Sequence, residues 1–396
     1  MKILMLTPYV PYPPNSGGQI RTFNLIKNLS KKHEITSFSF RRSDHDIPDL
    51  SELKQYCRQV RTFARKKSFN SPLKILRTGF SRYPYLVNMY RHRGAQQAIA
   101  EELSNTKYDL IHVETYYIMP NLPNTTVPVL LAEQTIEYQV YQHYANSSPI
   151  WPIKPLLYID VAKHKYWEKH YWQEAKKVIA MSDADKQKML QLIPNLNVSV
   201  VPNGVDTVFF QEKILIQKFP DTILFVGNFN WLQNREAAEV LAKNIWPKIK
   251  AKLPAVKLWI VGREPTDNIK KLATTDITIS SDVEDIRTAF QGSSVLVAPL
   301  YGAGGTRYKI LEAMASGLPV VTTRIGIEGI EATSRQNVLL GDTDEEIANL
   351  TIELIKNQKL ANTIALSARK FVYQNFDWKS ISRGLEKIYE ETARKN

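Results

Sequence analysis

The residues best suited to chemistry lie in one segment, 298–321, which reads APLYGAGGTRYKILEAMASGLPVV. It predicts the end of a buried strand, a glycine-rich loop, a helix and a second apolar strand. Thr306 is expected to cap the helix, whose first turns carry Arg307, Lys309 and Glu312. Helix amides and two cations suit a phosphate-bearing ligand, and a carboxylate suits the hydroxyl pair of a sugar. A surface loop before an ordinary amphipathic helix is the alternative interpretation.

A layered framework of strands and helices must position these side chains. The chain of 396 residues is too long for one ordinary domain and suits two. Apolar runs that predict strands lie at 2–7, 34–40, 110–113, 128–131, 178–180, 198–201, 222–226, 257–261, 277–280, 295–298 and 319–322. Helices are predicted at 19–30 and 236–252, and a long helix within 156–180 runs into the strand at 178–180. This alternation predicts an α/β protein with doubly wound parallel sheets.

The pattern restarts at 202–206, PNGVD, which indicates two consecutive doubly wound domains. We expect a first domain at 1–203, a second at 204–375, and a helix at 376–396 that returns to the first. Gly227, Gly262 and Gly302 follow predicted strands of the second domain. Ligands of such sheets bind at the carboxyl ends of strands, and a cleft between two such domains is a natural place to join two substrates.

Composition narrows the protein class. The chain is 43% hydrophobic and 23% charged, which indicates a globular protein. No apolar run reaches the roughly 18 residues that span a bilayer, and Met1–Leu6 is too short for a signal-peptide core. The single cysteine, Cys57, excludes a disulfide framework. We therefore expect a cytoplasmic protein.

Positive charge is concentrated between Lys54 and Arg93, where eleven basic and no acidic residues are interleaved with aromatic ones. This mixture suits an anionic membrane surface, which would place the protein peripherally at the inner face of the plasma membrane. A solvated basic face of a helical insertion is an equally open interpretation. A nucleic-acid patch is the least favoured of the three, and we expect no nucleic-acid partner.

Several motifs in their order and spacing resemble those of the GT-B glycosyltransferases, specifically the retaining, nucleotide-sugar-dependent enzymes of family 4. They are 201–206, 225–227, 260–262, 298–300, 311–315 and 317–321. The form GGTRYKILEAMASGLPVV is similar to the branch associated with bacterial exopolysaccharide and surface-glycan assembly. The resemblance implies two Rossmann-like domains, a donor linked to UDP or GDP, and a glycan or lipid-linked acceptor.

The resemblance also implies roles for particular residues. Of the two glutamates usual in the family, the second falls on Glu312, which would hold the ribose hydroxyls, and the first falls on Gly304. The usual arginine and lysine after the first strand of the second domain fall on Asn228 and Gln233, which cannot neutralise a diphosphate. Arg307 and Lys309 would replace them in catalysis by stabilising the leaving nucleoside diphosphate.

The remaining candidates divide between donor and acceptor. The donor-binding set expected from the resemblance and the strand ends is Gly227, Asn228, Arg263, Val283, Gly304, Gly305, Thr306 and Glu312. Gly17, Gly18 and Glu114 are the acceptor-side candidates. His112 and Glu114 alternate at a strand end, so only one of them is expected to face the cleft. Glu114 is preferred, and His112 is interpreted as a core histidine.

We therefore expect a retaining glycosyltransferase in bacterial surface polysaccharide synthesis. The family mechanism implies attack on the face that the diphosphate leaves, with the leaving phosphate taking the proton. No acidic pair is spaced to hold a catalytic metal, so no metal or other cofactor is expected. One rival is a nucleotide-sugar epimerase of the same fold. Another is a catalytically degenerate binding protein, suggested by the missing carboxylate at Gly304.

Overall fold

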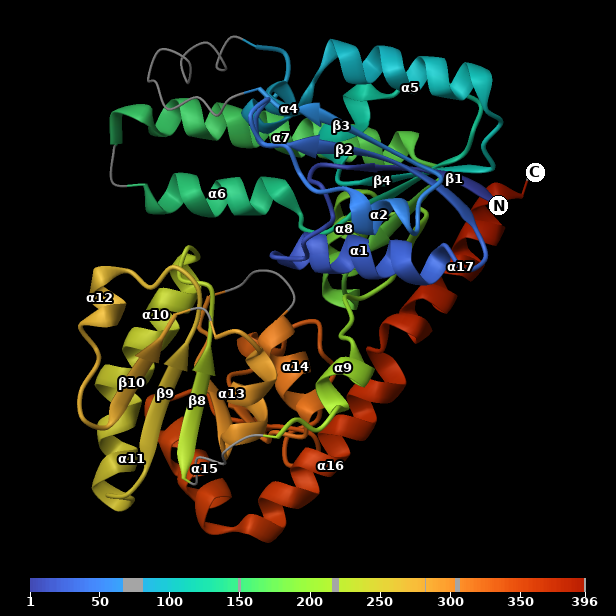
Figure 1. Cartoon of the computed structure of the whole chain (residues 1–396). Coiled ribbons are helices and arrows are strands. Elements are labelled where there is room, and N and C mark those ends of the chain that lie inside the picture. The colour runs from blue at the N-terminus through green and yellow to red at the C-terminus, as the bar shows by residue number, and fades with distance from the viewer. Residues whose placement is uncertain (67–80, 149–150, 216–220, 282, 303–306, 395–396) are drawn as a thin grey trace. The chain divides into compact units, whose positions relative to one another are not determined.

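The computed structural model describes residues 1–66, 81–148, 151–215, 221–281, 283–302 and 307–394 (Figure 1). It divides into two compact units, one of Met1–Pro202 with Ser382–Asn396 and one of Asn203–Ile381. The sequence predicted that the first unit ends at residue 203, one residue later than observed. It predicted that the returning segment begins at residue 376, whereas the observed segment begins at Ser382. Among the described residues, no helix combines the length and the apolar character needed to cross a membrane.

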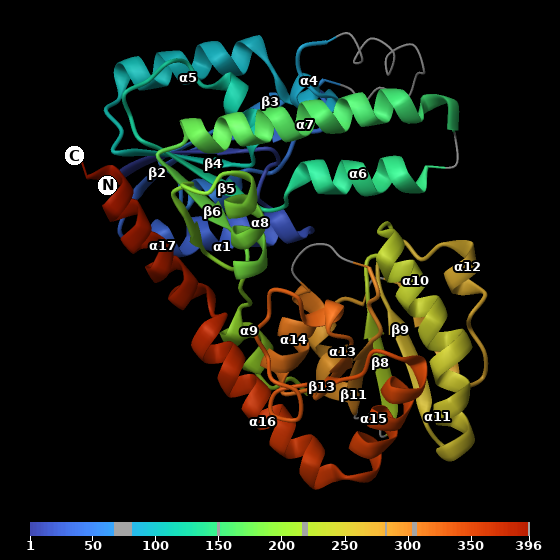
Figure 2. The same cartoon turned by 180° about the vertical axis from the view of Figure 1, so that it is seen from behind.

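The first unit contains a seven-stranded parallel sheet in the order β3-β2-β1-β4-β5-β6-β7. Its strands are β1 (Lys2–Thr7), β2 (Glu34–Arg41), β3 (Gln59–Ala64), β4 (Leu110–Glu114), β5 (Val129–Glu133), β6 (Lys177–Ala180) and β7 (Val198–Val200). Its helices include α1 (Gly17–Leu29), α2 (Ser51–Lys54), α4 (Tyr85–Tyr90), α5 (Arg93–Asn105), η1 (Tyr116–Asn121), α6 (Glu137–Ser147), η2 (Trp151–Ile153), α7 (Lys154–Glu174) and α8 (Asp183–Leu192). Helix α1 lies on one face of the sheet, and α5 and α7 lie on the other (Figure 2).

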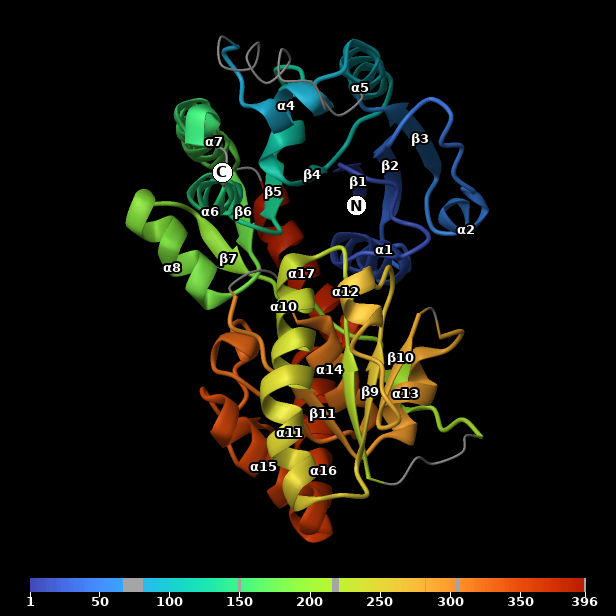
Figure 3. The same ribbon diagram turned by 90° about the vertical axis from the view of Figure 1, so that its left-hand side faces the viewer.

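The second unit contains a six-stranded parallel sheet in the order β10-β9-β8-β11-β12-β13. Its strands are β8 (Thr222–Val226), β9 (Lys257–Val261), β10 (Ile277–Ser280), β11 (Val295–Ala298), β12 (Val320–Thr322) and β13 (Leu339–Leu340). Its helices include α9 (Thr207–Gln211), α10 (Leu232–Val240), η3 (Leu241–Ile245), α11 (Trp246–Lys252), α12 (Asp267–Lys270), α13 (Ile286–Gly292), α14 (Tyr308–Ser316), η4 (Ile325–Ile327), α15 (Asp344–Lys356) and α16 (Gln358–Asn375). α10 and α11 run along this sheet (Figure 3).

Helix α17 (Trp378–Ala393) begins in the second unit and ends in the first. Its later turns pack against the first sheet through Leu385 and Tyr389, which are fully buried. Glu386 on the same helix lies 3.3 Å from the Nε2 atom of His33. The C-terminal segment thus completes the core of the first unit.

Both sheets confirm the doubly wound α/β fold predicted from the alternation of strands and helices. The central strands are almost continuously apolar because helices cover both faces of the sheet. Ile3, Leu4 and Met5 of β1 are fully buried, as are all four residues of Val295–Ala298. In each sheet the strand order reverses once, at β1/β4 and at β8/β11. Ligands of this fold bind beside such a reversal, at the carboxyl ends of the strands.

Strand β3 and the π-helical turn η3 are among the elements that differ from the sequence analysis. One interpretation of the basic stretch 54–93 was a helical insertion, but part of this stretch, Gln59–Ala64, forms strand β3. Its sequence, QVRTFA, places charged or polar residues beside apolar ones and forms an edge strand with no fully buried residue, so its apolar signal is weak. The single helix expected at 236–252 is interrupted by a π-helical turn, η3, between α10 and α11.

Candidate functional site

In the second unit, two strand-end glycines bring the ends of β8 and β9 into direct contact. The amide of Gly227 donates to the carbonyl of Val261 at 2.9 Å. A Cβ atom on Gly262 would lie 1.7 Å from the carbonyl oxygen of Gly227, which no side chain tolerates. A Cβ atom on Gly227 would lie 3.2 Å from Cβ of Asn234. These glycines therefore allow the close packing that forms this edge of the sheet.

Lys309, in the first turn of α14, is half-buried beside that edge. Its Nζ atom donates to Oδ1 of Asn234 at 2.7 Å and lies 4.6 Å from the ring centroid of Phe225. No carboxylate lies within ion-pair distance of it among the residues that the structure describes. Burial, assisted by the charge of Arg307, lowers the pKa of Lys309 to about 7. An approaching anion would restore its positive charge.

Arg307 precedes α14 and is 7% exposed. Its Nη2 atom donates to the carbonyl of Gly302 at 2.5 Å, which holds the guanidinium against the loop after β11. Burial lowers its pKa, whereas the charge of Glu328 acts in the opposite direction. Arg307 and Lys309 are thus not freely exposed helix residues, which the sequence analysis left as the alternative.

Glu312 lies one turn further along α14 and is half-buried. Burial raises its pKa to about 7, and the neighbouring charge of Lys309 acts against this rise. Within the described part of the chain, its carboxyl group has no hydrogen-bond or ion-pair partner. A half-buried carboxyl group with free oxygens is suited to accept hydrogen bonds from hydroxyl groups.

For the other predicted donor-binding residues, the described contacts do not indicate a ligand site. Helix α14 begins at Tyr308 with Arg307 as its N-cap. Thr306, Gly304 and Gly305 lie outside the described residues. Asn228 stabilises its own turn, because its Oδ1 atom accepts from the amide of Asn230 at 3.0 Å.

Two further donor candidates follow β9 and β10. Arg263 is exposed, and its carbonyl accepts from the amide of Phe229 at 3.0 Å. Val283 is half-buried against the hydrophobic core of the second unit. Neither contacts Lys309 or Glu312 through an interaction of the described residues.

In the first unit, Gly18 lies in the first turn of α1, which begins at Gly17, two residues earlier than predicted. A Cβ atom on Gly18 would lie 2.4 Å from Oη of Tyr9 and 2.5 Å from Oε1 of Gln134. Gln134 in turn donates to Oη of Tyr9 and, at 2.7 Å, to Oε2 of Glu114. The loop after β1 therefore contacts the end of β5 through the side chains of Tyr9 and Gln134.

Glu114 and His112 both point to the same side of the sheet, where Nε2 of His112 lies 3.2 Å from Oε1 of Glu114. The expectation that only one of them faces this side is wrong, because residues two apart in a strand share a face. Both are fully buried, and Nδ1 of His112 is hydrogen-bonded to Oη of Tyr389 on α17. Glu114, an acceptor-side candidate, is therefore enclosed by other side chains. Gln134, which donates a hydrogen bond to it, is half-buried and so partly exposed to solvent.

Neighbouring charges explain how Glu114 stays ionised although it is buried. Burial opposes its ionisation, but His112 and Arg21 outweigh it and hold its pKa below the ordinary value. Arg21, also fully buried, places Nε 3.9 Å from Oε1 of Glu114. Its Nη1 atom donates to the carbonyls of Val201 and Pro202 at 3.1 and 2.9 Å. Sequence reasoning missed Arg21, although a charged residue on the apolar face of a predicted helix is a usable signal.

A second buried carboxyl pair, Glu133 and Glu168, supports the helices beside the site. Oε1 of Glu133 accepts from the amide of Tyr116 and from Nε1 of Trp172, at 3.1 and 3.0 Å. Glu168 accepts from two amides at the start of α6, at 2.7 and 3.1 Å. Burial, with the mutual charge, raises the pKa of Glu133 well above its ordinary value. These contacts indicate a structural role.

Neither unit offers a clear metal centre in its described residues, where no three His, Cys, Asp or Glu side chains gather in a way that would hold a metal ion. The positive charge near α14 comes from side chains instead. A diphosphate bound there would meet Lys309 and Arg307, with Glu312 one turn away.

Comparison with known proteins gives matches over both halves. The model of "Glycosyltransferase Family 4" matches residues 15–209, and that of "Glycosyl transferases group 1" matches residues 220–357. The chain is 24% identical to an uncharacterized 44.6 kDa protein in the cps region of Klebsiella pneumoniae, over 96% of this chain and 97% of that protein. It is 26% identical to a phosphatidyl-myo-inositol mannosyltransferase of Mycolicibacterium smegmatis, over 76% of this chain and 75% of that protein.

Among solved structures, Anabaena HepE in complex with UDP and glucose is similar, with a TM-score of 0.64. The similarity covers 99% of this chain and 100% of that chain at 17% sequence identity. At this identity the likeness shows the fold alone, which is the two-sheet architecture predicted from the sequence.

Proposed function

We propose, because this chain belongs to the glycosyltransferases of family 4, that it transfers a sugar from a nucleoside diphosphate donor to a glycan or lipid-linked acceptor. The reaction retains the anomeric configuration. The acceptor hydroxyl attacks the anomeric carbon on the face from which the diphosphate leaves. The glycosidic bond forms as the bond to the diphosphate breaks, and the departing phosphate takes the hydroxyl proton.

The observation that carries this proposal is the half-buried Lys309 beside the end of β8, with Arg307 and Glu312 on the same helix. The free site holds a cation that burial disfavours, and a diphosphate supplies the charge that stabilises it. Fixed cations also lower the reaction barrier, because they stabilise the negative charge that develops on the leaving diphosphate in the transition state. In this proposal Glu312, one turn further along α14, accepts hydrogen bonds from the ribose hydroxyls.

Surface polysaccharide synthesis is the context that the relatives favour. One relative comes from a cps region and another is named a mannosyltransferase of phosphatidyl-myo-inositol, which is a lipid. A UDP complex is known for a protein of the same fold, which favours UDP among the donor nucleotides, with GDP as the other candidate. The acceptor would bind to the first unit, beside Gly18 and Gln134.

A peripheral position at the inner face of the plasma membrane is part of the proposal. Besides the basic stretch 54–93, the helices α6, η2 and α7 carry exposed aromatic side chains. They include Tyr144, Trp151 and Tyr166, which are 57%, 78% and 63% exposed. Exposed aromatic and basic side chains together suit the headgroup layer of an anionic membrane.

The test is a thermal-shift panel of UDP, GDP, ADP, dTDP and CMP with the full chain, followed by transfer or donor hydrolysis with the matching nucleotide sugar. Stabilisation by one nucleotide and turnover of its sugar would support the proposal. Nucleotide binding without any turnover would support a degenerate binding protein. Interconversion of two nucleotide sugars without an acceptor would support an epimerase.

Glu312→Ala is expected to weaken binding of that nucleoside diphosphate by about 1–3 kcal/mol, because ribose hydroxyls buried in the complex lose their acceptor. Glu312→Gln keeps an acceptor oxygen and should lose less. Titration calorimetry measures both variants, and Glu239→Ala, which removes a carboxylate paired with Lys243 on the same unit, is the matched control. Equal affinities of Glu312→Ala and the native protein would show that the ribose assignment is wrong.

Removal of divalent metal is expected to leave the transfer rate within about twofold, because Arg307 and Lys309 supply the charge that a metal would otherwise bring to the diphosphate. The measurement is the initial rate in EDTA and in magnesium. A rate that collapses in EDTA and returns with magnesium would contradict the expectation that no metal is required.

A further inference from the structure

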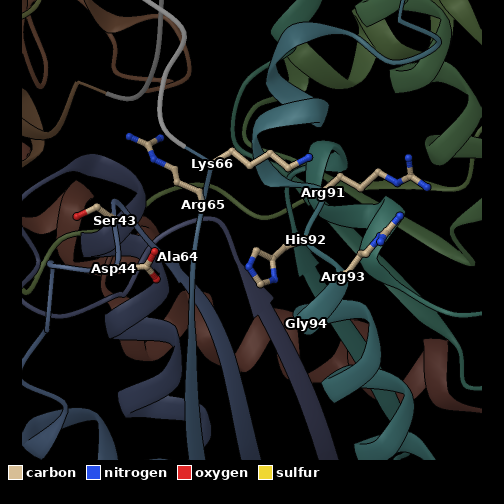
Figure 4. A pocket seen from close by; sticks show the side chains of 9 residues that line it. All are labelled: Ser43, Asp44, Ala64, Arg65, Lys66, Arg91, His92, Arg93 and Gly94. Atoms are coloured by element: carbon tan, nitrogen blue, oxygen red, sulfur yellow. The ribbon is translucent and has the colours of Figure 1, made fainter.

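A pocket of about 600 Å³ opens in the first unit, away from Gly18 and Gln134. It is lined by the segments that follow β2 and β3 and by the start of α5 (Figure 4). The lining residues are Ser43, Asp44, Ala64, Arg65, Lys66, Arg91, His92, Arg93 and Gly94, here called the basic pocket. In Figure 4 the side chains of Lys66, Arg91 and Arg93 lie on one side, with Arg65 and Asp44 on the other.

None of the four cations of the basic pocket has a carboxylate partner among the described residues. Arg41 is paired with Asp44 at 3.4 Å, so the one carboxylate of the pocket already has a cation. Arg58, just before β3, is likewise paired with Glu34 at 3.3 Å. Four like charges around one cavity repel one another, and an anion in the cavity would relieve this repulsion.

Two of the cations are held in place by aromatic rings. Nη1 of Arg65 donates to Oη of Tyr90 at 3.0 Å, and its guanidinium carbon lies 5.7 Å from the ring centroid. The guanidinium carbon of Arg91 lies 5.3 Å from the ring centroid of Tyr83. Cation–π contact of this kind orients an arginine without neutralising it. The pocket therefore presents positive charge on partly fixed side chains.

The start of α5 adds to this charge. The helix has thirteen residues, and its first turn carries no acidic side chain that would offset the positive end of its dipole. His92 is its N-cap, where Nδ1 accepts from the amide of Ala95 at 3.1 Å. The amide of His92 donates to Oδ1 of Asn121 at 2.9 Å, which fixes this cap to the end of η1.

We propose that the basic pocket binds a phosphoryl group, a phosphate or diphosphate, that anchors the acceptor. A carboxylate would neutralise one charge, whereas a single phosphate carries about −1.5 to −2 and three acceptor oxygens that arginine can contact in a bidentate manner. The inference rests on the proposed function, because it names the class of acceptor that this enzyme takes.

The position of the pocket fits this role. Strand β2 lies beside β1, and β1 lies beside β4, so the ends of β2 and β4 are two strand spacings apart. The pocket is lined by the segments after β2 and β3, which are two and three strand spacings from β4. At about 4.8 Å for each spacing, these segments lie on the order of 10–15 Å from the end of β4, where Glu114 and Gln134 meet. A short glycan linked to a phosphate bound in the pocket would span that distance and bring a sugar hydroxyl to the Gly18 and Gln134 side.

Two sources share this chemistry, the headgroup of a membrane phospholipid and the phosphoryl linkage of the acceptor itself. The test uses the full chain and the pocket variant Arg91→Ser/Arg93→Ser, since both side chains are exposed and their removal leaves the core intact. The matched control is Lys31→Ser/Lys107→Ser. It removes the same charge from exposed positions just before β2 and β4, at the amino-terminal ends of these strands, whereas the pocket follows the carboxyl ends of β2 and β3.

Inorganic pyrophosphate is the deciding probe, titrated by calorimetry with the nucleoside diphosphate present at saturation so that the site at Arg307 and Lys309 is already filled. We expect the pocket variant to lose at least tenfold in affinity at this site and the control to stay within twofold of the native chain. Equal affinities of the pocket variant and the native chain, or equal losses in both variants, would overturn the inference. Both variants should bind the nucleoside diphosphate as tightly as the native chain does. A native chain that does not bind any nucleoside diphosphate would instead count against the proposed function.

Vesicles then identify the source of the phosphoryl group. Sedimentation compares phosphatidylglycerol vesicles with phosphatidylcholine vesicles, with and without pyrophosphate. If pyrophosphate displaces the native chain from phosphatidylglycerol, and the pocket variant binds these vesicles weakly, the pocket binds a lipid headgroup. If pyrophosphate binding depends on the pocket but vesicle binding does not, the phosphoryl group belongs to the acceptor.

Discussion

Replacing Lys309 by methionine is expected to lower kcat by about 100- to 1000-fold, the loss typical of removing one preorganised group that stabilises developing charge. The ammonium group of Lys309 is half-buried and has Asn234 as its hydrogen-bond partner. Water screens such a charge less than it screens a surface charge, so its effect on the leaving diphosphate is large. Initial rates with the donor identified by the nucleotide panel measure the loss.

Lys243→Met is the matched control, because Lys243 is an exposed lysine of the same unit that pairs with Glu239 at 2.7 Å. It should change kcat by less than twofold. The thermal midpoint of Lys309→Met should stay close to that of the native chain, which separates a catalytic effect from loss of fold. A kcat within threefold of the native value would remove Lys309 from the catalytic role.

The pH dependence of binding gives an independent measure of the same lysine. Burial lowers the pKa of Lys309 to about 7 in the free protein, and a bound diphosphate favours the charged form and so raises it. Affinity should therefore be highest below pH 7 and fall as the pH rises through this value, by up to about tenfold per pH unit. Calorimetry at pH 8 in two buffers should show proton uptake on binding, which Lys309→Met should abolish.

The sequence predicted the elements that carry Arg307, Lys309 and Glu312, but not the contacts that these side chains make. The spacing of Arg307, Lys309 and Glu312 is a local property, and the structure places them at the N-cap and within the first five residues of α14. The contact of Lys309 with Asn234 joins residues 75 positions apart. It depends on how α10 and α14 meet, which hydrophobic periodicity does not encode.

In the first unit the sequence predicted strand β4, but it wrongly predicted that His112 and Glu114 point to opposite sides of the sheet. Glu114 was singled out, but its neighbours His112, Gln134 and Tyr389 join it through packing. Tyr389 is 277 positions from His112. Its part in the network follows from the return of α17 to the first unit, which the sequence predicted as a helix without indicating which side chain it would bring.

Arg21→Met is expected to destabilise the first unit by about 3–5 kcal/mol, the usual result of breaking a buried ion pair by removing one partner. The fully buried guanidinium lies 3.9 Å from the Glu114 carboxylate and also donates to the carbonyls of Val201 and Pro202. Methionine fills part of the volume but supplies neither the charge nor the donors. For a unit of this size the melting temperature should fall by roughly 6–20 °C.

Arg58→Met is the matched control, because Arg58 pairs with Glu34 at 3.3 Å on the surface of the same unit and is 46% exposed. Such pairs contribute about 0–1 kcal/mol, so its melting temperature should change little. Glu114→Gln combined with Arg21→Met removes both charges and should recover part of the loss. If the single and double variants lost the same stability as each other, the carboxylate would not depend on Arg21. The buried network would then act through the two carbonyl contacts, and Arg21 would serve to anchor the end of the first unit at Pro202.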